Sequence, residues 1–457
     1  MYFYDIKKQD DRIMKLKNIA IKNFRGFENQ RFEFDSQMNV VLGDNTSGKT
    51  TLLHAIQISL GAYLQSMTLL PGGKPFRRNF REMDYMRTYS EANRTFLRNP
   101  EKPMIEVNAD FFAKTFHMSD GTISSALKDI QWAKTNNNIS QRNAGELLNL
   151  VSEMEQIRTH ADETKQNAIF PLLLSFGANR IEKNYRAAMK TKARESNIEK
   201  AYKCALEEEV DFQSAFDWIY KYEKNFDKGY EFEGTDKAFM QAIKTAIPAI
   251  REIDIDYKNS EFSAQIKMSA YPKPKWLTYN MMSDGFKAMI NIVAELAYRC
   301  IQLNGFLGER AVKETPGIVM IDELDLYLHP HWQQHVLADL QLAFPYFQFI
   351  VTTHSPFIVQ SVQSRNIITL DGEKGTSDPN KRSIEEIVVS EMNMDTVRSA
   401  KYNEMVDTAE RYFQLVKKGD AHTPAAEEIR RALDEIEYQF SDEPAYVALL
   451  RAERGMK

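Results

Sequence analysis

Several common sequence features are scarce or missing in this chain of 457 residues. It has two cysteines, Cys204 and Cys300, whose wide separation argues against a disulfide framework and against a cysteine-based zinc site. It has no uninterrupted apolar run of the roughly 18 residues that a membrane span requires. Its N-terminal stretch has no apolar core of the kind found in secretion signals. We therefore expect a cytoplasmic protein that makes no membrane contact.

The chain also lacks an excess of positive charge. Its formal net charge is −5, so the protein as a whole is not a basic nucleic-acid binder. Two stretches are locally basic, residues 74–98 and 179–194, and are candidates for DNA contact. Solvated helix faces, or arginines that serve a nucleotide site, explain them equally well. Within the first stretch we expect Asp84 and Arg87 to pair inside the fold.

A phosphate-binding pattern lies between a predicted strand and a predicted helix. Residues 15–24 and 31–34 have the composition of strands, and MNVVL at 38–42 is the short apolar run of a buried strand. Helical spacing begins directly after Lys49. The loop between them matches G-x-x-x-x-G-K-[ST], in which backbone N–H groups surround phosphate oxygens and the lysine reaches the β- and γ-phosphates. A chance turn is the alternative.

This loop predicts ATP as the ligand and Mg²⁺ as its companion ion, with the Thr50 hydroxyl as a metal ligand. The residues expected to contact the nucleotide follow one another along the chain: Gly43, Asp44, Asn45, Thr46, Ser47, Gly48, Lys49, Thr50 and Thr51.

Two further strands are predicted to end in polar residues that suit ATP chemistry. GIVMIDELDLYLHP, residues 317–330, places Asp322 and Glu323 at a strand end, where the first acid is able to hold Mg²⁺ and the second to polarise the attacking water. FIVTTHSP, residues 349–356, places His354 at another strand end, where it is able to sense a γ-phosphate. Taken singly, both patterns also occur as ordinary structural acids and a packing histidine.

A fourth motif opens an apolar helix. Ser283, Asp284 and Gly285 form a tight turn before FKAMINI, and the free N–H groups of such a helix start suit a phosphate. An ordinary helix N-cap has the same appearance.

In this order and spacing, the four motifs resemble those of ABC-type ATPase heads of the RecF, SMC and OLD-like group. KLKNIAIKNFRGF, residues 15–27, resembles that group's opening strand and N-F-R element, GDNTSGKT its Walker A motif, and MMSDGFK its signature motif. VMIDELDLYLHP resembles its Walker B motif and D-loop, and VTTHSP its H-loop. The resemblance implies an α/β fold, an ABC-type P-loop ATPase head.

The resemblance also implies site residues and a dimer. Arg25 of the N-F-R element joins the nucleotide contacts. Two protomers sandwich ATP, so that Ser283 and Gly285 of one contact the γ-phosphate held by the other, and higher homo-oligomers are compatible with this. The signature reads M-S-D-G-F instead of L-S-G-G-Q, and a Q-loop glutamine has no clear counterpart: residues 105–112 offer Asn108. We therefore expect hydrolysis that is slow or needs a trigger.

The predicted organisation is a discontinuous head over residues 1–380 and a C-terminal helical segment over residues 381–457 that docks a partner. Helical insertions are expected at about 118–168 and 183–245, a core strand within 167–180, and a β-hairpin within 250–271.

The tail separates related families. It lacks the acidic pattern of the Toprim nuclease found in OLD proteins, and the chain has no long heptad arm of the SMC kind. Residues 392–419 and 440–455 resemble the end of the PtuA family, the ATPases of Septu and some retron antiphage systems, which work beside a separately encoded HNH nuclease, PtuB. The alternatives are an AriA-like ATPase of PARIS defence, a RecF-like DNA-repair ATPase, and a scaffold that binds ATP without turnover.

Overall fold

A computed structural model describes residues 14–71, 76, 78–178, 195–207, 212–267, 273–370, 377–392, 394, 399–419 and 423–439. The chain divides into two compact units, residues 1–393 and 394–457. The division lies beyond the predicted boundary at residue 380, because helix α13 (Ile384–Ser390) packs against α12 (Pro356–Gln360) of the first unit.

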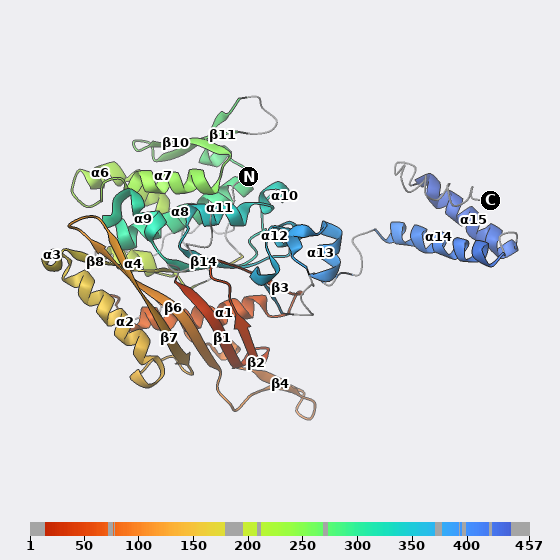
Figure 1. Cartoon of the computed structure of the whole chain (residues 1–457), viewed down its shortest axis with the longest axis horizontal. Coiled ribbons are helices and arrows are strands. Elements are labelled where there is room, and N and C mark those ends of the chain that lie inside the picture. Colours follow the sequence, from red (N-terminus) through yellow and green to blue (C-terminus); the bar gives the residue numbers. More distant parts are fainter. Residues whose placement is uncertain are drawn as a thin grey trace. The chain divides into compact units, whose positions relative to one another are not determined.

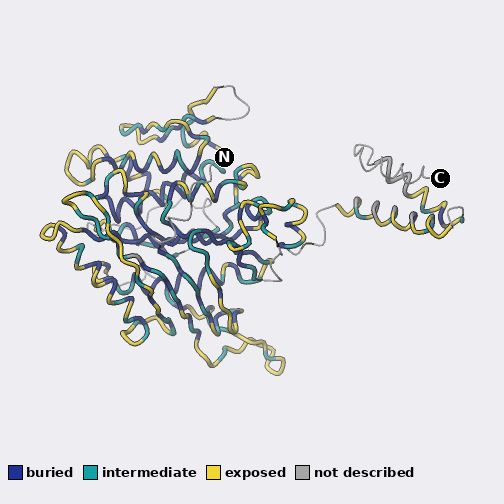
Figure 2. Tube along the Cα trace, viewed as in Figure 1, coloured by how far each residue is buried: buried dark blue, intermediate teal, exposed yellow. Residues whose placement is uncertain are grey.

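The centre of the first unit is a parallel sheet of five strands in the order β15-β3-β14-β13-β9. Its strands are nearly all buried and run through the dark-blue interior in Figure 2. Continuous apolar sequences suit strands covered on both faces. The predicted α/β architecture is confirmed. The bounds are β3 (Met38–Leu42), β9 (Leu172–Phe176), β13 (Gly317–Ile321), β14 (Phe347–Thr352) and β15 (Ile367–Thr369).

A second sheet is antiparallel, in the order β2-β1-β6-β7, with β8 also paired to β6. The predicted core strand within 167–180 is two strands, because the chain passes from β8 of this sheet through Pro171 to β9 of the parallel sheet. The bounds are β1 (Lys15–Phe24), β2 (Phe27–Glu33), β6 (Met104–His117), β7 (Ile123–Lys134) and β8 (Gln166–Ile169). A separate hairpin pairs β4 (Arg87–Ser90) with β5 (Thr95–Arg98).

Helix α1 (Lys49–Ser66) packs against β1, β6 and β7 of the antiparallel sheet and against α2 (Gln141–Thr159) (Figure 1). Apolar side chains occur on every face of α1, and the helix is buried along almost its whole length. A helix of this kind belongs in a core. Its N-terminus, which follows the phosphate-binding pattern, is therefore firmly fixed.

Another group of helices packs around α8, and a three-stranded sheet β10-β11-β12 adjoins it. Strands β10 and β11 form the hairpin predicted within 250–271. The helices are α4 (Asn197–Tyr202), α5 (Gln213–Tyr220), α6 (Tyr222–Phe226), α7 (Thr235–Ala246), α8 (Asp284–Asn304), α9 (Ala311–Glu314), α10 (Pro330–Gln333) and α11 (Val336–Ala343). The short helix α3 (Ala161–Thr164) instead contacts α2 and β8. The strands are β10 (Ile250–Asp256), β11 (Glu261–Ile266) and β12 (Lys275–Thr278).

The expected helical insertion at 118–168 is wrong over its first part. Residues 123–134 form β7, the edge strand of the antiparallel sheet, and α2 lies over it. Only Ile130, Trp132 and Lys134 of this strand are buried, so most of its sequence is polar and resembles a solvated helix. In the second stretch, 183–245, the described residues from 197 onward contain the helices α4 to α7 joined by turns, and residues 183–194 and 208–211 lie outside the described part.

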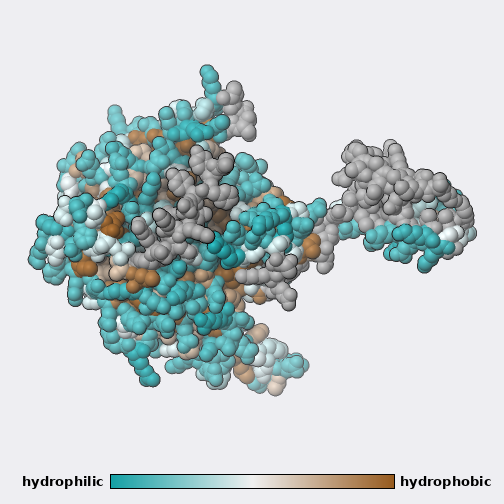
Figure 3. Space-filling view, viewed as in Figure 1, coloured by the Kyte–Doolittle hydropathy of each residue, from teal (hydrophilic) through white to brown (hydrophobic). Residues whose placement is uncertain are grey.

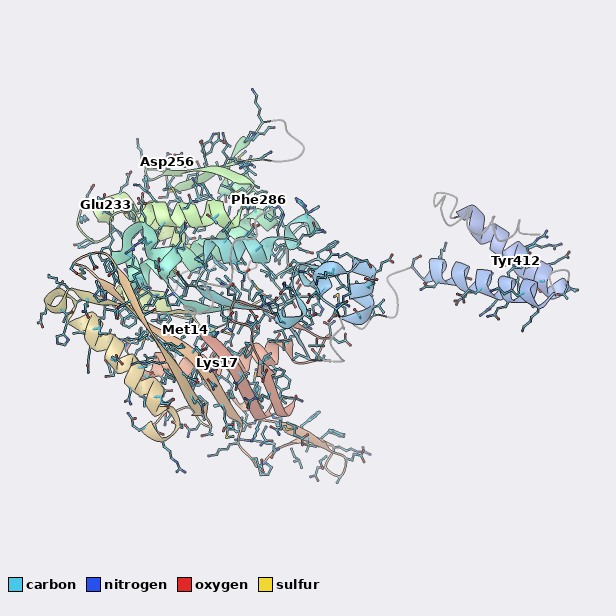
Figure 4. All side chains as sticks on the ribbon, viewed as in Figure 1. Met14, Lys17, Glu233, Asp256, Phe286 and Tyr412 are labelled. Carbon is cyan, nitrogen blue, oxygen red and sulfur yellow. The ribbon has the colours of Figure 1, made fainter. Side chains whose placement is uncertain are left out.

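The second unit contains two described helices, α14 (Ala400–Lys418) and α15 (Pro424–Gln439), which pack against each other. Tyr412, labelled in Figure 4, and Ala426 are buried within this unit. Residues 440–457 of the predicted C-terminal helical segment lie outside the described part.

Candidate nucleotide site

Three strand ends of the parallel sheet bring the predicted motifs together. Strands β3, β13 and β14 are neighbours and parallel, so their carboxyl ends meet at one edge of the sheet. The phosphate-loop pattern follows β3, Asp322 follows β13, and His354 follows β14. Ligands of open α/β sheets bind at such an edge.

The loop after β3 has the backbone of a phosphate cradle. Gly48 adopts φ of 107°, and a Cβ atom at this position would lie 2.9 Å from the ring of Phe27. Only glycine fits both conditions. The loop then enters α1, whose N-terminus attracts anions. Ser47 has a buried hydroxyl oxygen without a hydrogen-bond partner among the described residues, as expected where a ligand supplies one.

Lys49 folds back over this loop. Its Nζ donates hydrogen bonds to the carbonyl oxygens of Gly43, at 2.7 Å, and Asp44, at 2.9 Å. Its side chain is buried, so the ammonium lies inside the loop and not in solvent. A phosphate that enters the loop meets a positive charge already in place.

Asp322 connects the loop to the neighbouring strands. Its Oδ2 accepts a hydrogen bond from the Thr50 hydroxyl, at 3.1 Å, and its Oδ1 accepts one from the Thr352 hydroxyl, at 2.5 Å. A carboxylate beside a hydroxyl is the oxygen donor set that Mg²⁺ prefers next to a nucleotide. The two residues predicted as metal ligands are therefore in contact and fit the ion.

Glu323 lies at the start of the turn after β13 with a left-handed φ of 49°. Such a backbone is costly for a residue with a side chain, and it is found at functional sites. The Glu323 N–H donates to the Thr352 hydroxyl at 2.7 Å. Its carboxylate is partly exposed at the edge where the γ-phosphate of a bound nucleotide would lie.

The His354 backbone is fixed while its side chain is exposed. Asp325 Oδ1 accepts hydrogen bonds from the His354 N–H, at 3.2 Å, and from the Thr353 hydroxyl, at 2.5 Å. This aspartate lies two residues after Glu323. Its carboxylate therefore ties the His354 backbone to the segment that carries Glu323.

The signature residues form a separate part of the site. Ser283 is exposed at the N-cap of α8, and no hydrogen bond among the described residues joins it to the phosphate loop. Gly285 lies against the backbone of the Walker B segment: a Cβ there would lie 2.8 Å from the Tyr327 carbonyl oxygen. The next residue, Phe286 (labelled in Figure 4), packs edge-on against Trp332 with ring centroids 4.4 Å apart.

Arg25 lies beside the phosphate loop, but its guanidinium is engaged elsewhere. It forms an ion pair with the buried carboxylate of Asp84, at 2.7 Å, and Arg78 approaches the same carboxylate at 3.6 Å. Arg78 donates to Gln57 of α1 at 2.7 Å. Asp84 and Arg87 both pair inside the fold, but not with each other: Asp84 pairs with Arg25 and Arg78, and Arg87 with Glu82.

Two residues of the site went unnoticed in the sequence. Glu391 and Met392, which follow α13, line a small cavity together with Gly43, Asp44 and His354. Arg382 forms an ion pair with Glu391, which fixes the end of α13. Nothing in the sequence places these residues, about 350 positions after Gly43, beside the phosphate loop.

The structure also bears on two further expectations for the head, the position of the Q-loop residue and the basic stretch 74–98. Asn108 lies in the middle of β6, paired with Asn18 and Gln131, and not at the end of a parallel strand where a Q-loop residue belongs. In the basic stretch 74–98, Arg87 and Arg98 both pair with Glu82. Much of that charge is therefore neutralised locally; the stretch 179–194 lies outside the described part.

Three kinds of comparison bear on this site. An "AAA domain" family model matches residues 18–256, more than half of the chain. A second model, "AAA domain, putative AbiEii toxin, Type IV TA system", matches residues 241–360. Together they span all four motifs.

Among curated proteins, a retron Ec83 probable ATPase of Escherichia coli is 24% identical, over 82% of this chain and 75% of that protein. A retron Vc95 probable ATPase of Vibrio cholerae is 23% identical, over 92% and 86%. Septu protein PtuA of Bacillus thuringiensis is 32% identical, over 29% of this chain and 36% of that protein.

Among solved structures, an SMC head bound to the C-terminal winged-helix domain of ScpA aligns with a TM-score of 0.39 at 14% identity, over 79% of this chain and 96% of that one. The SMC head domain from Thermotoga maritima gives 0.36 at 14%, over 77% and 95%. Within the described part of the chain, no helix is both long and apolar enough to cross a membrane.

Proposed function

This chain belongs to the AAA-domain family of ATPases, and we propose that it is the ATPase subunit of an antiphage defence complex whose ATP-dependent dimer controls a separately encoded HNH nuclease. The observation that carries the proposal is the division of the ATP site. The phosphate-binding half is assembled within one chain, whereas Ser283 of the signature half is exposed and has no hydrogen bond to the phosphate loop among the described residues.

The assembled half supplies binding and water activation. Lys49 and the N-terminus of α1 hold the phosphates, and Thr50 and Asp322 hold Mg²⁺, which neutralises the charge that develops on the phosphates. Glu323 polarises the attacking water, and His354 contacts the γ-phosphate. These roles follow from the strand ends that position each side chain.

The exposed half implies a second copy of the chain. Ser283 and Gly285 of one protomer contact the γ-phosphate held by its partner, so that ATP lies between two chains. Ser283→Arg is expected to prevent this dimer while leaving ATP binding by the monomer intact. Measurement of molecular mass with and without ATP tests this, and a wild-type monomer under both conditions contradicts it.

The C-terminal unit is the proposed docking site for the nuclease. It begins at residue 394, directly after Glu391 and Met392, which line the cavity beside the phosphate loop. The lining of this cavity is thereby two residues, counted from Met392, before the start of this unit. Coupling between two sites needs such a shared element.

The defence assignment rests on the extent of the similarity. The two retron ATPases match more than four fifths of this chain, whereas a RecF protein of Lactococcus lactis, at 49% identity, matches 43 residues. A DNA-repair role is therefore less well supported, since those residues cover 9% of the chain. An HNH gene beside this one would support the nuclease partner, and a Toprim gene would favour an AriA-like system.

The deciding experiment removes residues 394–457 and measures two properties of the same sample. We expect the variant to lose co-purification of the HNH nuclease and to retain ATP binding. Retention of the nuclease refutes the docking role. Loss of ATP binding shows instead that the segment supports the head itself.

A further inference from the structure

A second cavity, of about 230 Å³, lies away from the phosphate loop. It is bounded by four parts of the first unit: the C-terminal end of α7 with the turn after it, α8, α10 and α11. The space-filling view of one face of the first unit is mostly hydrophilic, with a few hydrophobic clusters (Figure 3). The lining of the cavity indicates what kind of ligand would fit it.

Most of the cavity wall is apolar. Ile247 and Pro248 come from the turn after α7, Met289 from α8, Trp332 from α10 and Val336 from α11. A wall of this kind binds the apolar body of a small molecule. The Trp332 ring adds a π-face, which also attracts cations.

Polar side chains also line the cavity, among them His335, which immediately precedes α11, and Asp339 on that helix. Nδ1 of His335 is buried and has no hydrogen-bond partner among the described residues. The Asp339 carboxylate, one helical turn further on, is half-buried, and no described side chain pairs with it. A buried polar atom without a partner is costly, and an unsatisfied one needs an explanation.

The charge states of these groups define the missing partner. Burial raises the pKa of Asp339 to about 6, so the carboxylate is mostly ionised at neutral pH. Burial and the neighbouring His331 lower the pKa of His335, so its imidazole is neutral there. Lysine and arginine are both missing from the described lining. The cavity therefore presents a net negative charge and one hydrogen-bond acceptor or donor on an apolar wall.

We propose that this cavity is a binding site for a small organic cation with an apolar body, such as an amine, guanidine or amidine. Asp339 pairs with the positive group, and His335 hydrogen-bonds to it or beside it. Trp332, Met289 and the turn after α7 enclose the apolar part. An anion would be repelled by Asp339, and a neutral ligand would leave the carboxylate unpaired.

The site adjoins the helix that carries the signature motif. Met289 lies on α8, and Trp332 contacts Phe286, three residues after Ser283. A bound ligand thus touches the same helix that would contact a partner's nucleotide. Binding itself does not depend on the proposed function, so the binding test remains valid if that proposal fails.

The test uses the full-length protein and three probe cations: benzamidine, phenethylamine and butylguanidine. Calorimetry or ligand-observed NMR measures each affinity, with benzamide as the neutral counterpart of benzamidine. We expect at least one cation to bind, and benzamide to bind at least about tenfold more weakly. Asp339→Asn is expected to weaken cation binding by a similar factor. Asp162→Asn, which alters an exposed aspartate of α3, is the matched control and should change nothing.

A second variant tests whether the ligand occupies this cavity. Ala249→Leu, which adds bulk to the lining, should also reduce binding, and thermal unfolding verifies that each variant folds. Failure of all three cations to bind overturns the proposal. So does binding that benzamide equals, or that Asp339→Asn leaves unchanged in a folded protein.

Discussion

The two halves of the candidate ATP site differ in how firmly the chain holds them. The phosphate half is held by hydrogen bonds that join the start of α1 and the end of β14 to the segment after β13: Thr50 to Asp322, Thr352 to Asp322, and Thr353 to Asp325. The signature half rests on a close backbone contact between Gly285 and Tyr327, and Ser283 is exposed. One half is complete before ATP arrives, and the other has its reactive groups free for a second molecule.

The difference indicates where nucleotide binding and turnover are separable. Substitution of the residues that hold the phosphates should abolish nucleotide binding, whereas substitution of Glu323 or of the signature residues should reduce turnover and leave binding intact. The predictions below test this division, in decreasing order of expected effect.

Lys49→Ala should have the largest effect. It removes the buried ammonium that lies inside the loop, and charge-assisted hydrogen bonds to phosphate are strong, so ATP affinity should fall by at least about 100-fold. Binding of a fluorescent ATP analogue measures this. Lys258→Ala, at an exposed turn, serves as the control. Unchanged affinity in Lys49→Ala would remove the assignment of the loop.

Glu323→Gln should separate binding from turnover within the phosphate half. The amide cannot polarise water, so turnover should fall by about 100-fold or more while ATP stays bound and the dimer accumulates. Phosphate release and mass measurement are the readouts. Glu261→Gln on β11 controls for loss of an exposed charge. If the wild type shows no turnover under any trigger, Glu323 has no catalytic role and the chain is an ATP sensor.

Gly285→Ala tests the signature half. The added Cβ would lie 2.8 Å from the Tyr327 carbonyl, so the start of α8 must shift. We expect turnover to fall by about tenfold, with ATP affinity of the monomer within about twofold of wild type. Gly26→Ala is matched, because a Cβ there meets no atom within 4 Å. Equal loss of binding and turnover would contradict the division into halves.

Asp339→Asn should have the smallest effect, and one that depends on pH. The pKa of Asp339 in the folded protein, about 6, lies above the ordinary aspartate value of 3.8, so the folded state binds this proton more tightly than the unfolded state does. The free energy of unfolding therefore decreases as pH rises from about 4 to 6, and the penalty is complete above that window. The asparagine variant should be more stable at pH 7.5 by about 1 kcal/mol, allowing for partial exposure, and equal to wild type below pH 4.

Thermal unfolding across this pH range gives the measurement. Asp162→Asn should be indifferent to pH in the same comparison. A constant difference between Asp339→Asn and wild type at all pH values would mean that the carboxylate does not titrate as described.

The sequence alone was sufficient to predict the strands that consist almost entirely of apolar residues. β13 has no polar residue, β3 and β14 carry only Asn39, Gln348 and Thr352 within apolar runs, and the loop after β3 has the spacing of a phosphate cradle. It was insufficient for β7, where one buried face alternates with a polar one over a few residues, so that helix and strand have similar patterns.

Contacts across the sheet were also out of reach. Thr352 and Asp325 support Asp322 and His354, but their roles depend on which strands are neighbours. Glu391 reaches the phosphate loop only because α13 packs back on α12. Arg25 is a different case: its motif predicts a nucleotide contact, and the fold gives it in addition a partner, Asp84, that the motif does not reveal.

The position of Lys49 has a consequence for ligand selectivity. Its ammonium already donates to two carbonyl oxygens of its own loop, so any incoming anion must replace those bonds before it gains affinity. A phosphate ion alone makes too few contacts to compensate for the loss of those hydrogen bonds. A triphosphate engages the lysine, the loop N–H groups and the magnesium ligands simultaneously, and so recovers the loss. We therefore expect the loop to discriminate against abundant small anions and to respond to nucleotide.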